Sequence, residues 1–220
     1  MPTRARTRRP LSRERILRAA LALADEDGVE SITMRKLGND LGFEAMSLYN
    51  HVANKDDVID GILDLVLAEG DLPSAKGDWA IAIRESAISV HAAFRRHPWA
   101  CKALLSPRHQ RPARLRYMDV LLGRLRDAGF SAETTYHAYH VLDGHIFGFS
   151  LWETAHSIPE AQMDDLRALF DRLVPADEYP HLREHGIQHQ TEGAHHEMSA
   201  FEFGLDLILA GLKNIHEPAS

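Results

Sequence analysis

The chain has 220 residues, of which 45% are hydrophobic and 26% are charged, as is typical of a globular protein. No stretch approaches the roughly 18 uncharged apolar residues of a membrane span, and the apolar segment from Ala19 to Ala24 is too short for the core of a secretion signal, so we expect a cytoplasmic protein. The single cysteine, Cys101, excludes an intrachain disulfide.

The N-terminal residues have the opposite charge to the rest of the chain. Residues 1–18 contain seven arginines and one acidic residue, whereas the whole chain has a net charge of −7. We interpret residues 1–11 as a basic, disordered arm suited to contact with a polyanion such as a phosphate backbone. A solubilising tail is the alternative for this arm.

The first predicted helix follows the arm. Ser12 can cap it, apolar residues from Ile16 to Ala24 recur at helical spacing, and Gly28 ends it. We expect its apolar face to pack on the next two helices.

Residues 31–55 predict two short helices joined by a tight turn. Thr33 is a good N-cap for the first of them, and Gly42 supplies the left-handed residue that ends it. Its buried face is expected to comprise Met34, Leu37, Gly38 and Leu41. Leu48 and Val52 give the second helix its inward face, and its outward face fits a DNA major groove.

A fourth helix is predicted after Asn54, its expected N-cap. Its apolar residues occupy more than one side, so it can pack on two parts of the protein and transmit a signal between them. Residues 70–77 form the clearest break in the chain. We therefore predict a DNA-binding domain over residues 12–69, which includes the linking helix, and a second domain over residues 78–220.

These N-terminal residues resemble the DNA-binding domain of the TetR (tetracycline repressor) family. Residues 48–55, Leu-Tyr-Asn-His-Val-Ala-Asn-Lys, match the family pattern Leu-Tyr-x-His-Phe/Val-x-x-Lys, within a resemblance that covers residues 12–67. Residues 201–212 resemble the closing helix of the tetracycline-type branch. The resemblance implies an all-α fold, with an N-terminal three-helix helix-turn-helix domain and a larger helical domain for ligand binding and dimerisation.

We predict a DNA-binding face of nine residues. They are Thr33, Arg35, Ala45, Met46, Ser47, Tyr49, Asn50, His51 and Lys55. The resemblance implies that Thr33, Tyr49, His51 and Lys55 hold phosphates or brace the motif. Arg35, Ala45, Met46 and Asn50 are candidates for base edges, because arginine suits guanine, asparagine suits adenine and apolar side chains suit thymine methyl groups.

The remainder of the chain is predicted to be helical, without strands. Helices are expected at residues 79–97, 99–105, 108–128, 132–156, 163–173 and 197–215, and residues 175–196 are expected to be a loop. The helices at 132–156 and 197–215 carry glycines that allow close approach: Gly144, Gly148, Gly204 and Gly211. The resemblance implies that these two helices form a homodimer with their twofold mates; packing within one chain is the alternative.

The helix at 132–156 is also rich in aromatic residues and histidine, which suggests a pocket for a small effector. Our candidates are His91, His137, His140, Phe147 and Trp152, each of which could instead be a hydrogen-bonded core residue. His181 and His185 have the spacing of zinc ligands on a helix, but we predict no metal and no cofactor, because no cysteine is nearby and the segment is expected to be a loop.

The sequence therefore predicts a ligand-responsive transcriptional regulator: a repressor that binds palindromic operator DNA as a homodimer and is released by a small, largely apolar effector. A DNA-binding regulator without an effector and an enzyme using the histidine-rich domain are the alternatives. No Gly-x-Ser-x-Gly or HExxH signature is present, so we predict that the protein is not an enzyme.

Overall fold

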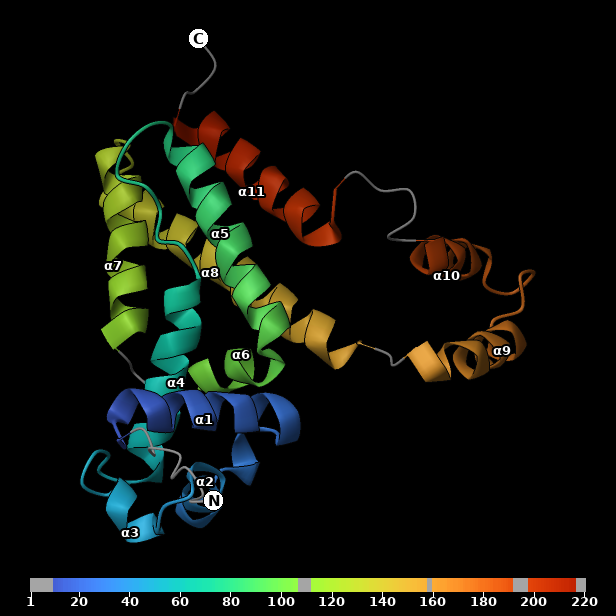
Figure 1. Cartoon of the computed structure of the whole chain (residues 1–220). Coiled ribbons are helices and arrows are strands. Elements are labelled where there is room, and N and C mark those ends of the chain that lie inside the picture. Colours follow the sequence, from blue (N-terminus) through green and yellow to red (C-terminus); the bar gives the residue numbers. More distant parts are fainter. Residues whose placement is uncertain (1–9, 107–111, 158–159, 192–197, 217–220) are drawn as a thin grey trace, which may run out of the picture. The chain divides into compact units, whose positions relative to one another are not determined.

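The computed structural model describes residues 10–106, 112–157, 160–191 and 198–216. All regular structure in these ranges is helical (Figure 1), which confirms the predicted all-α fold. Its α-helices are α1 (Arg13–Asp27), α2 (Met34–Leu41), α3 (Ala45–Leu48), α4 (Lys55–Glu69), α5 (Trp79–Arg96), α6 (Pro98–Leu104), α7 (Pro112–Asp127), α8 (Ala132–Ala155), α9 (Met163–Leu173), α10 (Pro180–Thr191) and α11 (Ala200–His216).

The helix starts of the N-terminal region follow the predicted capping residues. The Oγ of Ser12 accepts a hydrogen bond from the Arg15 amide at 3.3 Å, and the Oγ1 of Thr33 accepts one from the Lys36 amide at 3.1 Å. Asn54 caps α4 through its Oδ1, 2.8 Å from the Asp57 amide nitrogen. These side chains satisfy backbone donors that a helix start leaves free, so all three predicted caps are confirmed.

The chain divides into two compact units, residues 1–139 and 140–220, and the division lies inside α8. The predicted break at residues 70–77 is present as the non-helical connection between α4 and α5. Within the first unit, α4 packs against α1, α5, α6 and α7. Its side chains Val58, Ile62, Leu63 and Val66 are fully buried, as expected for a helix that is apolar on more than one side.

The prediction of a loop over residues 175–196 is wrong, because α10 occupies Pro180–Thr191. Proline suits the first turn of a helix, and α10 is further stabilised by contacts with α9. An NH1 nitrogen of Arg183 lies 2.8 Å from Oδ1 of Asp171, and a Cβ on Gly186 would overlap the ring of Phe170. The glycine and histidine residues lower the helix propensity of this segment, so the sequence pattern did not indicate a helix that tertiary packing stabilises.

Some expectations fall outside the described residues. These are the basic arm apart from its last two residues, the first residues of the helix expected from Arg108, and residues 192–196 of the expected loop. No helix within the described ranges is long and apolar enough to cross a membrane.

Candidate nucleic-acid interface

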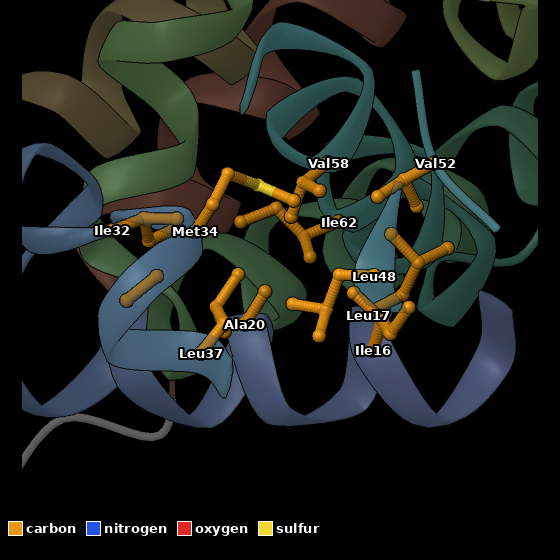
Figure 2. Close-up of a cluster of buried hydrophobic side chains, with 11 residues drawn as sticks. Ile16, Leu17, Ala20, Ile32, Met34, Leu37, Leu48, Val52, Val58 and Ile62 are labelled. Carbon is orange, nitrogen blue, oxygen red and sulfur yellow. The ribbon is translucent and has the colours of Figure 1, made fainter. Parts of the chain in front are cut away.

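A hydrophobic core holds the first four helices together, as Figure 2 shows. Ile16, Ala20, Leu37, Leu48 and Ile62, which come from α1, α2, α3 and α4, have no exposed surface. Because fully buried aliphatic side chains fix the relative positions of helices, this core orients the outward residues of α2 and α3. Leu48 and Val52 are both buried, which confirms the predicted inward face of the second motif helix.

The turn between α2 and α3 depends on two glycines. Gly42 ends α2 in the left-handed conformation, with φ 73° and ψ 32°, as predicted. A Cβ on Gly38 would lie only 2.8 Å from the carbonyl oxygen of Phe43 and 3.1 Å from the amide nitrogen of Ala45. Gly38 is buried, as predicted, and it also lets the start of α3 approach the backbone of α2, which the sequence pattern did not indicate.

The second motif helix is shorter than predicted. Helix α3 spans Ala45–Leu48, and a turn follows in which the amides of His51 and Val52 donate to the Leu48 carbonyl oxygen at 2.9 and 3.1 Å. Tyr49, Asn50, His51 and Val52 all have weak helix propensity, which accounts for the early end of the helix. The outward residues are thus presented by one helical turn and the hydrogen-bonded turn after it.

The predicted DNA-binding residues differ in exposure. Met46 is 73% exposed and Tyr49 is 44% exposed, and the other exposed members are Thr33, Arg35, Asn50 and His51. Ala45 and Ser47 are partly buried, and Ala45 packs against the core of the motif. Lys55 is also partly buried, with its Nζ donating to the Glu30 carbonyl oxygen at 3.3 Å. The structure therefore leaves six of the nine side chains accessible to a ligand.

Basic side chains brace this region through contacts that sequence reasoning missed. The guanidinium of Arg13 donates two hydrogen bonds to the carboxylate of Asp57, at 2.7 and 2.8 Å, and ties α1 to α4. These hydrogen bonds raise the pKa of Arg13. Arg15 lies over the ring of Phe43 at 5.4 Å and so contacts the turn between α2 and α3. Lys36 forms an ion pair with Asp27 at the end of α1.

The predicted effector residues do not share one environment. His91 on α5 and Phe147 on α8 are buried, whereas His137, His140 and Trp152 are exposed. The periodicity of an α-helix places His137 and Trp152 on the same exposed face of α8 as Val141, Gly144 and Gly148. These five residues define the outer face of α8.

Helices α8 and α11 contact each other on a different face. The Nε2 of His145 lies 2.9 Å from the carbonyl oxygen of Phe201, and the two rings stack with centroids 4.9 Å apart. A Cβ on Gly204 would lie 2.6 Å from the Cε1 of His145, so this glycine serves packing within the chain. Gly144, Gly148 and Gly211 differ, because a Cβ there would meet no heavy atom of the described chain within 4 Å.

Helix α11 also has an exposed apolar stripe. Phe203 and Leu207 are each 60% exposed and Ile215 is 62% exposed, and Gly211 lies between them at helical spacing. These four residues define the outer face of α11.

Among the described residues, no group of three or more His, Cys, Asp or Glu is arranged to hold a metal ion.

Comparisons with known proteins show which family this chain resembles. Residues 72–215 match the family model described as the tetracyclin repressor-like, C-terminal domain. The chain is 30% identical over 209 residues to the tetracycline repressor protein class D of Escherichia coli, which covers 92% of this chain and 89% of that protein. It is 28% identical over 213 residues to the transcriptional repressor DrrR1 of Streptomyces coeruleorubidus, with 92% and 77% covered.

Solved structures agree with these matches. The TetR family protein ActR of Streptomyces coelicolor, in complex with actinorhodin, superimposes with a TM-score of 0.72 at 25% identity, covering 96% of this chain and 99% of that one. The matched proteins are transcriptional regulators and not enzymes. Helices α2 and α3 form a helix-turn-helix, the DNA-binding motif for which HTH-type regulators such as DrrR1 are named. The chain therefore belongs to the TetR (tetracycline repressor) family of ligand-responsive transcriptional repressors.

Proposed function

We propose that this protein binds a palindromic operator as a homodimer, with α3 and the turn after it in the major groove. The observation that carries the proposal is the exposure of Met46, Tyr49, Asn50 and His51 on an element that a buried core and two glycines hold in place. A pre-ordered surface built from a short helix and the turn after it fits a major groove.

The division of roles within this face follows from the chemistry of each side chain. Arg35, Met46 and Asn50 are exposed and suit base edges, whereas Thr33, Tyr49 and His51 suit phosphates. Ala45 packs against the core, so its contact with a thymine methyl would use only the part of the side chain that remains exposed. Lys55 and Ser47 are partly covered and complete the predicted set as residues at its edge.

The homodimer is supported by the outer faces of α8 and α11. Both present apolar side chains next to glycines that would allow another helix to approach closely. A twofold assembly buries both outer faces. It also brings two reading heads, the α2–α3 motif of each protomer, to one palindrome, which is the usual arrangement for helix-turn-helix dimers. His137 and Trp152 lie on this outer face of α8, so we assign them to the dimer interface before any effector pocket.

A small, largely apolar effector is proposed to release the DNA. Relatives support a small-molecule ligand: ActR has been solved with (S)-DNPA and with actinorhodin. In this chain His91 and Phe147 remain the buried candidates for contact with such a ligand, and His140 is an exposed one. A regulator of this kind acts where the chromosome is, so we assign the protein to the cytoplasm.

The test is DNA binding by the purified full chain. A binding-site selection from random duplexes should return one palindromic consensus, and fluorescence anisotropy should give a stoichiometry of two chains per site. Selection of no sequence, or binding without preference between the consensus and a scrambled duplex, would reject the repressor function.

A further inference from the structure

A buried imidazole joins the ends of two helices to a third segment of the first unit. His97, between α5 and α6, is only 7% exposed. Its Nδ1 lies 2.7 Å from Oδ1 of Asp25 near the end of α1, and its Nε2 lies 3.1 Å from Oε1 of Glu69, the last residue of α4. Both ring nitrogens therefore face carboxylate oxygens from other helices.

Each of the two carboxylates has a second partner on the same segment. The indole Nε1 of Trp99 donates to Oδ1 of Asp25 at 2.8 Å. The guanidinium of Arg96 donates two hydrogen bonds to Oε2 of Glu69, at 2.9 and 2.8 Å. We call Asp25, Glu69, Arg96, His97 and Trp99 the His97 joint. It connects α1 and α4 to the junction of α5 and α6.

Asp25 and Glu69 lie at the C-terminal ends of their helices, where an acidic residue is unfavourable for the helix itself. Asp25 lies in the last turn of α1, and Glu69 ends α4, and neither helix has a basic residue in its last turn. The C-terminal end of a helix carries partial negative charge, so an acid there is unfavourable unless another contact offsets the cost. The contacts with His97, Trp99 and Arg96 provide that offset, which indicates that the acids serve the joint and not their own helices.

We propose that the His97 joint is a positioning device for DNA binding, an inference that rests on the proposed function. Helix α1 carries Ile16, Leu17 and Ala20 of the core on which α2 and α3 pack, so fixing the end of α1 fixes the reading head. A palindrome requires both heads of a dimer at one spacing. A head that is held in place before binding loses less conformational freedom on the operator, and it binds more tightly for that reason.

The variants are chosen to open the joint without unfolding the helices. Asp25→Ala removes one carboxylate, and alanine is the best helix former. Trp99→Phe keeps an aromatic ring and removes only the indole N–H. His97→Gln removes the bridge between Asp25 and Glu69. The control, Asp171→Asn, breaks a carboxylate–guanidinium pair of similar length, the 2.8 Å pair with Arg183 that links α9 and α10.

Operator affinity of the full-length chain is measured by anisotropy on the selected consensus duplex over a series of salt concentrations, together with thermal unfolding. We expect each joint variant to bind about three- to tenfold more weakly, with an unchanged slope of log affinity against log salt, because no phosphate contact is lost. The Asp25→Ala/His97→Gln double variant should lose less affinity than the two single losses combined, because both single variants remove the same contact between Asp25 and His97. The control should bind like the wild type.

Two results would overturn the joint as a positioning device. Joint variants that melt earlier but keep wild-type operator affinity would assign it to stability alone. A shallower salt slope would mean that the variants had lost phosphate contacts. If the wild-type chain selects no DNA at all, the proposed function fails and this inference fails with it, an outcome distinct from equal binding by wild type and variants.

Discussion

A Cβ atom on Gly38 would lie 2.8 Å from the carbonyl oxygen of Phe43, closer than side-chain carbons approach backbone oxygens in folded proteins. The Phe43 amide donates to the Gly38 carbonyl oxygen at 2.8 Å, so the two residues are also joined by a backbone hydrogen bond. This contact sets the distance between α2 and the start of α3, and with it the position of the side chains that face DNA.

Replacing Gly38 by alanine should therefore destabilise the N-terminal helices and weaken operator binding. The added methyl group meets backbone atoms, which cannot move without shifting α3, and overpacking of this kind costs about 1–3 kcal/mol. Urea unfolding measures the loss. Gly123→Ala is the matched control, since a Cβ at this position of α7 meets no described atom within 4 Å. It should be neutral or stabilise by up to about 1 kcal/mol. Equal stability of the Gly38 variant and the wild type would contradict the close approach.

Arg35→Ala should relax sequence preference at one position of the operator. Arg35 is exposed at the start of α2, and an arginine paired with guanine contributes about 1–3 kcal/mol of discrimination. Binding-site selection with the variant measures the change. Tyr49→Phe, which removes only a hydroxyl expected at a phosphate, should weaken binding but leave the consensus unchanged. An unaltered consensus for Arg35→Ala would remove Arg35 from the base-reading residues.

Deletion of residues 1–10 should make DNA binding less dependent on salt. The deletion removes four arginines, and each phosphate contact that is lost reduces the number of counterions released on binding. Affinity measured over a series of salt concentrations should show a shallower slope together with the same consensus sequence. An identical slope would show that the arginines of the arm make no phosphate contacts.

The features that were predicted correctly depend on residues close together in the chain. Ser12, Thr33 and Asn54 cap helices that begin at the next residue, and Gly42 ends α2 through its own backbone angles. Such features can be recognised from local sequence because the physical cause acts over three or four residues. The length of α3 was predicted less well, since weak propensities at residues 49–52 compete with a regular pattern of buried positions.

The features that were missed depend on residues far apart. Asp25 and His97 are separated by 72 positions, and no local pattern indicates that they meet. Helix α10 is stabilised by the contacts of Arg183 and Gly186 with α9, which likewise appear only after folding. The exposed face of α8 could have been predicted from the sequence, because His137 and Trp152 share the helical register of Gly144 and Gly148. The density of aromatic residues predicts a pocket on the same helix, and that prediction is untested at His137 and Trp152.

Placing bulk at the outer face of α8 should prevent dimerisation. A Cβ at Gly148 meets no described atom of its own chain within 4 Å, whereas the indole of Gly148→Trp would obstruct a second helix packed against that face. Sedimentation of Gly148→Trp should show a helical monomer, against a dimer for the wild type at micromolar concentration. Gly123→Trp, at the equally open position of α7, should remain dimeric. A dimeric Gly148→Trp variant would move the interface away from this face.

Two acids on α4 should affect stability in opposite directions as the pH changes. Burial alone would raise the pKa of Glu69, but hydrogen bonds and positive charge from Arg96 and His97 outweigh it and hold this pKa below its ordinary value of 4.5. The ionised form is thus favoured in the folded state. Its contribution to stability is present above the unfolded pKa and is lost as the pH falls through the folded pKa.

Asp64 has the opposite sign. Burial raises its pKa above the ordinary value of 3.8, despite the hydrogen bond that its Oδ1 accepts from the Ala113 amide and the nearby charges of Arg13 and Arg116. Its ionised form is therefore disfavoured in the folded state, and stability falls as the pH rises from the unfolded pKa through the folded one. Asp64→Asn keeps an acceptor for the Ala113 amide and removes the charge.

The matched pair is tested by urea unfolding of wild type, Glu69→Gln and Asp64→Asn at pH 7 and near pH 4. At pH 7 we expect Glu69→Gln to be less stable than the wild type and Asp64→Asn to be more stable. Both differences should shrink toward zero in acid, because protonation removes the charge that each amide replaces. Differences that persist unchanged at the lower pH would show that packing, and not ionisation, accounts for the effects of the two side chains.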